Sequence, residues 1–195
     1  MNTPNVGDGH ARWRVAIVDD HEPSRTALRG AVTAAGGAIV GESVRCSDVL
    51  AMVRRGSPDI VVCAVGLPDG DGVQAAAHVV QADCPVVLLT SHTDAALVER
   101  ARAAGVMAFL LKPLRPAELA PVLDLAIARF KDTRALKQSL EGRKVIERAK
   151  GTLMTRLGLT EDEAFRRLRR AAMDSRRPMV DIAKALLVSE TVSKP

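Results

Sequence analysis

Short apolar runs and helical patterns of apolar positions alternate along the first 115 residues. The runs are rich in β-branched residues or leucine and contain no regular polar positions, which is typical of strands buried on both faces. Five such strands separated by helices predict a parallel sheet with helices on both faces. The predicted strands are Val15–Val18, Ala38–Val40, Ile60–Val65, Val86–Leu89 and Met107–Leu111, and the predicted helices are Pro23–Ala35, Ser47–Arg55, Gly72–Gln81 and Asp94–Ala104.

Only helical patterns follow Pro116. Between Glu118 and Leu157 the last proline is Pro121, and apolar residues recur every three or four positions, with slips of phase between stretches. This pattern predicts one long helix that is partly coiled-coil-like. Two ordinary helices with a hinge near Gly142 are the alternative.

Two shorter helices are predicted near the end of the chain. Thr160 and Glu163 have the spacing of a capping box, which opens the first of them. Pro178 fits the first turn of the second. The expected fold is therefore α/β, with a doubly wound five-stranded parallel sheet over residues 13–130, then a coiled-coil segment and a small three-helix all-α domain over residues 131–190.

Positive charge is concentrated in the second part of the chain. The net charge is +5, with 11 Lys and Arg against 12 Asp and Glu in residues 1–115, and 17 against 11 in residues 116–195. This asymmetry indicates a polyanionic partner for the C-terminal helices and none for the first part. Aromatic residues make up only 2% of the chain, so a nucleic-acid surface cannot rely on rows of stacking aromatics.

The three cysteines, Cys46, Cys63 and Cys84, form no CxxC pair and have no histidine at ligand spacing, so no zinc site is expected. Residues 1–12 are polar and lack the apolar region of a signal peptide. No stretch approaches the length of a membrane span. We therefore expect a soluble protein of the reducing cytoplasm, with no membrane partner.

Polar residues end three of the predicted strands. Asp19 and Asp20 end the first strand, Thr90 the fourth and Lys112 the fifth, whereas Ala64 ends the third. In a doubly wound sheet the carboxyl ends of the strands meet at one crevice. We therefore expect two carboxylates, a hydroxyl and an ammonium group to converge there.

Residues 13–130 resemble the receiver domain of two-component response regulators, which has a flavodoxin-like fold. The resemblance rests on an ordered set of features. These are the acidic pair, the loop at residues 67–72 that reads LPDGDG, the Thr after the fourth strand, and the step Lys112-Pro113.

The resemblance implies roles for five residues. Asp19 and Asp20 would bind magnesium. Thr90 and Lys112 would hold the oxygens of a phosphoryl group. Phe109 would be the aromatic residue that changes rotamer when the domain switches.

The chain departs from the receiver pattern at Ala64, which occupies the position of the phosphoacceptor aspartate. A methyl group can neither form an acyl phosphate nor bind a metal, so at most weak magnesium binding by Asp19 and Asp20 is expected, and no cofactor. We do not expect Asp69 or Asp71 to substitute. The prediction is a pseudo-receiver whose leftover carboxylates pair with Lys112, and not an enzyme.

Helical spacing divides the helix after Thr160 into two faces. Its apolar face is expected to contain Ala164, Phe165, Leu168, Ala171 and Ala172. Its basic face is expected to contain Arg166, Arg167, Arg169 and Arg170. A small helical unit with a basic face suits phosphate contacts.

Residues 135–190 resemble the ANTAR domain, the RNA-binding antitermination module of AmiR- and NasR-type regulators. The resemblance rests on the strings IERAKGTLM, from Ile146, and EAFRRLRRAA, from Glu163. It implies binding to paired RNA hairpins with six-base loops in leader transcripts, so that a terminator does not form. The predicted RNA-binding residues are Arg143, Lys144, Arg148, Lys150, Gly151, Arg166, Arg167, Arg169 and Arg170.

The favoured function is therefore transcription antitermination, and two alternatives stay open. One is an adaptor, in which the pseudo-receiver binds a protein partner and the helical end only dimerises. The other is a DNA-binding regulator, because paired arginines on a helix also suit a helix-turn-helix. A homodimer is expected in the favoured case. Phe130, Leu136 and Leu140 are expected at a helix seam, either against another chain or against the protein's own domains.

Overall fold

The computed structural model describes residues 11–192, with side chains described through residue 189. Backbone contacts divide the chain into two units, Met1–Lys131 (unit 1) and Asp132–Pro195 (unit 2). The expected absence of a signal peptide concerns mainly residues 1–10, which lie outside the described residues. Among residues 11–192, no helix combines the length and the apolar character needed to cross a membrane.

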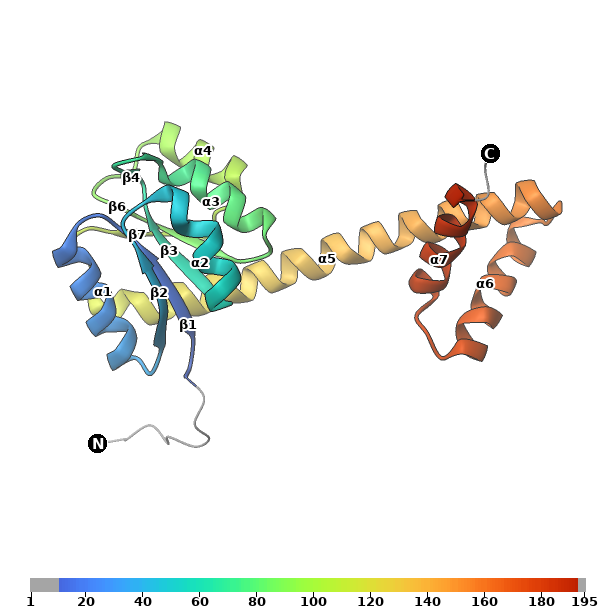
Figure 1. Cartoon of the computed structure of the whole chain (residues 1–195), viewed down its shortest axis with the longest axis horizontal. Helices are drawn as coiled ribbons and strands as arrows, with labels where there is room; N and C mark the ends of the chain where they lie inside the picture. Colours follow the sequence, from blue (N-terminus) through green and yellow to red (C-terminus); the bar gives the residue numbers. More distant parts are fainter. Residues whose placement is uncertain (1–10, 193–195) are drawn as a thin grey trace. The chain divides into compact units, whose positions relative to one another are not determined.

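Unit 1 is built on a five-stranded parallel sheet with the strand order β2-β1-β3-β6-β7 (Figure 1). The doubly wound sheet predicted from the apolar runs is therefore confirmed. A two-stranded antiparallel ribbon in the loop after β3 was not predicted, because each of its strands has only two residues. The strands are β1 (Arg14–Val18), β2 (Ala38–Ser43), β3 (Ile60–Ala64), β4 (Gly66–Leu67), β5 (Gly70–Asp71), β6 (Val86–Thr90) and β7 (Ala108–Leu111).

Helices cover both faces of this sheet (Figure 1). One face packs against α2, α3 and α4, and the other packs against α1 and the first part of α5. Leu119 and Leu123 of α5 are fully buried, and the indole N–H of Trp13 donates to Asp124 Oδ1 at 2.9 Å. The helices of unit 1 are α1 (Glu22–Ala34), the short 3-10 turn η1 (Cys46–Asp48), α2 (Val49–Gly56), α3 (Gly72–Gln81), α4 (Ala95–Ala104) and the start of α5 (Pro116–Leu157).

The long helix predicted after Pro116 is confirmed as α5, which begins in unit 1 and ends in unit 2. It has no break at Gly142, so the two-helix alternative is wrong. A Cβ atom on Gly142 would lie 3.0 Å from Val180 Cγ2 of α7 (Met179–Val192). Glycine at this position therefore lets α7 pack closely on α5.

Unit 2 is a three-helix unit made of the end of α5, α6 (Glu161–Ser175) and α7. Its small core consists of Ala149, Leu153, Ala164, Leu168 and Ala183. The predicted capping box is present at the start of α6, where the Glu163 carboxylate accepts the backbone N–H of Thr160 at 2.8 Å. This hydrogen bond holds the pKa of Glu163 below its usual value.

Candidate nucleic-acid interface and receiver pocket

The carboxyl ends of the strands bring the predicted pocket residues to one edge of the sheet. Ala64, Thr90 and Lys112 line a hollow of about 460 Å³, together with residues of α4 and of the loop before it. Asp19 is fully buried at the end of β1, where it contacts Lys112, whereas Asp20 is exposed. Neither predicted carboxylate lines this hollow directly, and only Asp19 is joined to it, through its ion pair with Lys112.

Asp19 is a buried carboxylate compensated by one cation. Lys112 Nζ lies 2.7 Å from Asp19 Oδ2, and the backbone N–H of His21 donates to Oδ1 at 3.0 Å. The ammonium group of Lys112 is close to Asp19 Oδ2, but its angle does not suit a hydrogen bond. Oδ2 therefore has no well-oriented donor among the described residues. The ion pair with Lys112 is therefore the interaction that offsets the burial of this charge.

Thr90 and Phe109 are both engaged within unit 1. The hydroxyl group of Thr90 is nearly buried and donates to the carbonyl oxygen of His92 at 2.8 Å. Phe109 on β7 is half-buried and packs against the core on the side of α3 and α4. Their sensing and switching roles remain predictions from the receiver resemblance.

A magnesium ion, which the receiver resemblance implies, fits this pocket poorly. Ala64 presents a methyl group where a further carboxylate would stand, and Lys112 is already paired with Asp19. Among the described residues, no group of three or more His, Cys, Asp or Glu side chains could hold a metal ion. Because magnesium needs several oxygen ligands in near-octahedral geometry, the pocket supports no metal-dependent step.

Asp69 and Asp71 are held in the loop that follows β3. Asp69 accepts the backbone N–H groups of Ser47 at 3.0 Å and Cys46 at 2.7 Å, which lowers the pKa of its carboxyl group. Asp71 caps the N-terminus of α3 and forms an ion pair with Arg100. These contacts give both carboxylates a structural role, and that neither serves as a phosphoacceptor stays a prediction.

Three of the predicted arginines of α6 border one hollow. Arg166, Arg167 and Arg170 line a cavity of about 650 Å³ together with Glu163 and the half-buried Leu159. Three guanidinium groups face one carboxylate, so the balance of charge is positive. We call this cavity the basic hollow. It combines phosphate-binding groups with a small apolar surface.

The fourth arginine lies on another side of α6. Since successive residues of a helix are about 100° apart, Phe165, Arg169 and Met173 form a separate line of exposed side chains. We call this line the Phe165 stripe. The prediction that Phe165 and Ala171 belong to the apolar face is wrong, because both are exposed. The buried face of α6 is narrower than predicted and consists of Ala164, Leu168 and Ala172.

Lys150 differs from the other basic residues predicted to bind RNA. Its ammonium group lies 2.7 Å from Glu161 Oε1 and 2.9 Å from both carboxylate oxygens of Glu147. The hydrogen bonds with Glu161 and Glu147 raise the pKa of Lys150, and the bond with Lys150 lowers the pKa of Glu161. Lys150 therefore links α5 to α6, and its contact with RNA stays a prediction.

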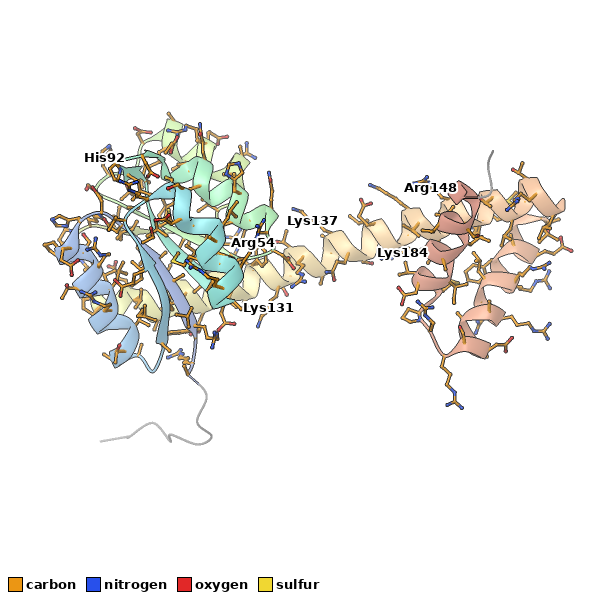
Figure 2. All side chains as sticks on the ribbon, in the orientation of Figure 1. Arg54, His92, Lys131, Lys137, Arg148 and Lys184 are labelled. Atoms are coloured by element: carbon orange, nitrogen blue, oxygen red, sulfur yellow. The ribbon has the colours of Figure 1, made fainter. Side chains whose placement is uncertain are left out.

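The remaining predicted residues of α5 are exposed: Arg143, Lys144, Arg148, which Figure 2 labels, and Gly151. Lys144 forms an ion pair with Glu141 at 2.7 Å, and both side chains are exposed to solvent. A Cβ atom on Gly151 would meet no other atom within 4 Å, so packing within the chain does not require glycine there. Helical spacing places Lys144, Arg148 and Gly151 on one side of α5.

Sequence reasoning missed Leu159 and Phe165 as surface candidates. Leu159 gave no signal, because it lies between two helices and outside any periodic pattern. Phe165 could have been found from its spacing, since Arg169 and Met173 follow it at intervals of four residues. The general expectation that a phenylalanine is buried outweighed this signal.

The fold and the pocket together define the receiver class of two-component response regulators. Two family models match the chain: "Response regulator receiver domain" over residues 15–124 and "ANTAR domain" over residues 134–187. The chain therefore belongs to the response regulator family, with a receiver domain followed by an ANTAR domain.

Known proteins resemble the chain in whole or in part. The transcriptional regulatory protein PdtaR of Mycobacterium tuberculosis is 38% identical over 190 residues, which cover 93% of this chain and 92% of that protein. The nitrate regulatory protein of Klebsiella oxytoca is 53% identical over 53 residues, 27% of this chain and 13% of that protein. The receiver domain structure of NarL from M. tuberculosis aligns with a TM-score of 0.55 and 26% identity, over 63% of this chain and 98% of that structure.

Proposed function

We propose that this chain is a transcription antitermination regulator that binds paired hairpins in leader RNA. The observation that carries the proposal is the basic hollow, in which Arg166, Arg167 and Arg170 surround a cavity of about 650 Å³. Guanidinium groups bind phosphates and can also stack on bases that are turned out of a loop. The match to the ANTAR family model supports the same function.

A hollow of this kind favours RNA over duplex DNA. Sequence-specific RNA recognition takes place mainly at unpaired loop nucleotides, which can enter a cavity. Duplex DNA is read at base edges in a groove, by side chains that project from a helix. Leu159 at the basic hollow offers apolar surface to an unstacked base. DNA binding and a pure adaptor role are outcomes that the following experiment can reveal.

The test compares two RNAs of equal length, a paired-hairpin leader and a scrambled sequence, on the full chain over a range of salt concentrations. Wild type should prefer the hairpins. Arg167→Ala/Arg170→Ala should weaken binding and make the log–log salt slope shallower by about one to two units, since each lost phosphate contact removes somewhat less than one. The control Arg54→Ala/Arg55→Ala removes two exposed arginines from unit 1, of which Figure 2 labels Arg54, and should change neither quantity.

Equal affinity for the hairpins and the scrambled RNA would show that the basic hollow binds RNA through charge alone, without specificity. Preference for a DNA duplex would favour the DNA-binding alternative. Absence of nucleic-acid binding would leave the adaptor as the better hypothesis.

The receiver-like domain acts in this proposal without phosphorylation. Ala64 has no group that can accept a phosphoryl group, and Asp19 and Lys112 form an ion pair. The domain then serves as a surface for a protein partner or as an autoinhibitory module, and no catalytic step is assigned to it. Two chains associate through α5, where Leu136 is 63% exposed and Leu140 is 48% exposed.

We place the protein in the cytoplasm, where leader transcripts are made. Its three cysteines are free. Burial raises the pKa of Cys63 and of Cys84 to about 12, so both thiols stay protonated and unreactive at neutral pH.

A further inference from the structure

Phe165 stands apart from the other aromatic residues. The chain has one Trp, three Phe and no Tyr. Trp13 is buried, and Phe109 and Phe130 are half-buried, whereas Phe165 is 38% exposed. The one ring that clearly faces solvent therefore lies on α6, the helix that also carries the basic hollow.

The surroundings of Phe165 combine apolar and cationic groups. Arg169 follows one turn later and is exposed, and Met173 follows two turns later with 68% of its surface exposed. None of these three side chains belongs to the core of unit 2. Helical spacing places the Phe165 stripe next to Arg166, which lines the basic hollow, so the two surfaces adjoin on the outward face of α6. A strand that crosses this face reaches both.

We propose that Phe165 is a base-stacking residue, on whose ring an unpaired base of the hairpin loop lies while the basic hollow holds neighbouring phosphates. Every base has a π-face, so one ring can bind a loop base without hydrogen bonds. Arg169 supplies a cation beside the stacked nucleotide. This inference rests on the proposed RNA function and assigns a specific contact within it.

A second copy of the chain is a poorer occupant of the Phe165 stripe. In a two-fold symmetric contact the same surface meets itself. Arg169, at the centre of the stripe, would then lie close to Arg169 of the other copy. Two like charges brought together without an intervening acid repel one another. A nucleotide has the opposite charge and a flat apolar face, which match the stripe on both counts.

The experiment uses the full chain and measures its binding to the intact hairpin RNA. It also measures binding to a series of hairpins, each of which lacks the base at one position of the loop. Phe165→Leu keeps apolar volume but has no ring. It should bind the intact hairpin about tenfold more weakly, within the range of one stacked base, with an unchanged salt slope. Phe165→Trp should bind at least as well as wild type. The loss caused by Phe165→Leu should vanish on the RNA that lacks the stacked base.

Val188→Ala is the control, because it removes apolar surface from an exposed residue of unit 2 that belongs neither to the Phe165 stripe nor to the basic hollow, and its affinity should stay within about twofold of wild type. Circular dichroism and light scattering check that each variant keeps its fold and assembly. If wild type selects the hairpin and Phe165→Leu binds it equally well, the stacking inference is wrong and the proposed function stands. If wild type does not select the hairpin, both the stacking inference and the proposed function are wrong. A change of assembly in Phe165→Leu with unchanged RNA affinity would make the stripe a protein interface and overturn the inference.

Discussion

In unit 1 the charged groups of the pocket are paired inside the domain, Lys112 with Asp19 and Arg100 with Asp71. In unit 2 the basic hollow sets Arg166, Arg167 and Arg170 around a single carboxylate, that of Glu163. Both sites contain several basic side chains, so their number does not distinguish them. The two sites differ in whether a nearby carboxylate already forms an ion pair with each basic side chain. A paired cation stabilises the fold, and an unbalanced group of cations is available to a polyanion.

The largest expected effect comes from returning a carboxylate to the pocket of unit 1. Ala64 lines the hollow of about 460 Å³ beside Thr90 and Lys112, so Ala64→Asp places an acceptor among groups suited to phosphoryl oxygens. With acetyl phosphate and magnesium, this variant should gain one alkali-labile phosphoryl group on the new carboxylate, with acetate as the leaving group. Wild type should gain none. Intact-mass spectrometry measures both.

A double variant, Ala64→Asp/Lys112→Ala, is the control, since it supplies the acceptor without the cation. It should be phosphorylated poorly. A phosphoryl group on wild type that maps to Asp69 or Asp71 would contradict the pseudo-receiver assignment and with it the view that this pocket is closed to phosphoryl chemistry.

The next largest effect should follow from breaking the buried ion pair. Lys112→Met keeps most of the side-chain volume but leaves Asp19, which has no exposed surface, without its cation. Removing one partner of a buried pair typically costs about 3 kcal/mol of unfolding free energy or more, because the remaining charge is uncompensated. Urea denaturation at neutral pH measures the loss. Lys131→Met, at an exposed lysine that Figure 2 labels, should cost about 0.5 kcal/mol or less. Equal stability of the two variants would show that the pair does not hold Asp19.

The contrast between the units also explains what the sequence could predict. The pocket was predictable because strand ends of a parallel sheet converge, so Asp19, Thr90 and Lys112 follow from the order of the strands alone. The capping box at Thr160 is a local motif and was equally readable. In both cases the relevant neighbours are set by topology or by a few adjacent residues.

The surface of unit 2 was predictable only in part. The basic character of α6 follows from composition, but periodicity cannot tell which flank of a helix its neighbours will cover. Phe165 was therefore placed on the wrong side. The ion pair of Lys150 was missed for a related reason, because its partner Glu161 belongs to the next helix. Such pairings depend on tertiary packing.

A third prediction concerns apolar groups left unpaired on α5. Residues 131–140 are all exposed, including Leu136 and Leu140. If a second chain covers them, Leu136→Glu/Leu140→Glu should convert a dimer to a monomer, since carboxylates would be buried at the seam. Light scattering gives the mass. Lys137→Glu, at another labelled residue in Figure 2, changes charge on the same segment without removing an apolar group and should keep the dimer. A wild-type monomer would rule out the intermolecular seam.

The smallest expected effects come from replacing Gly151 with alanine. This change should raise the stability of the protein and lower its affinity for RNA. Glycine in the interior of a helix costs about 0.5–1 kcal/mol relative to alanine, and no atom lies within 4 Å of a Cβ built on Gly151. Gly151→Ala should therefore stabilise the protein by about that amount in urea denaturation. If RNA approaches the side of α5 that carries Lys144, Arg148 and Gly151, the same methyl group should weaken hairpin binding several-fold. Gly142→Ala is the control, because its Cβ would lie 3.0 Å from Val180 Cγ2 and crowding should offset the gain in helix propensity. A Gly151→Ala protein that is more stable and binds RNA unchanged would remove this side of α5 from the interface and leave the basic hollow and the Phe165 stripe of α6 as the recognition surface.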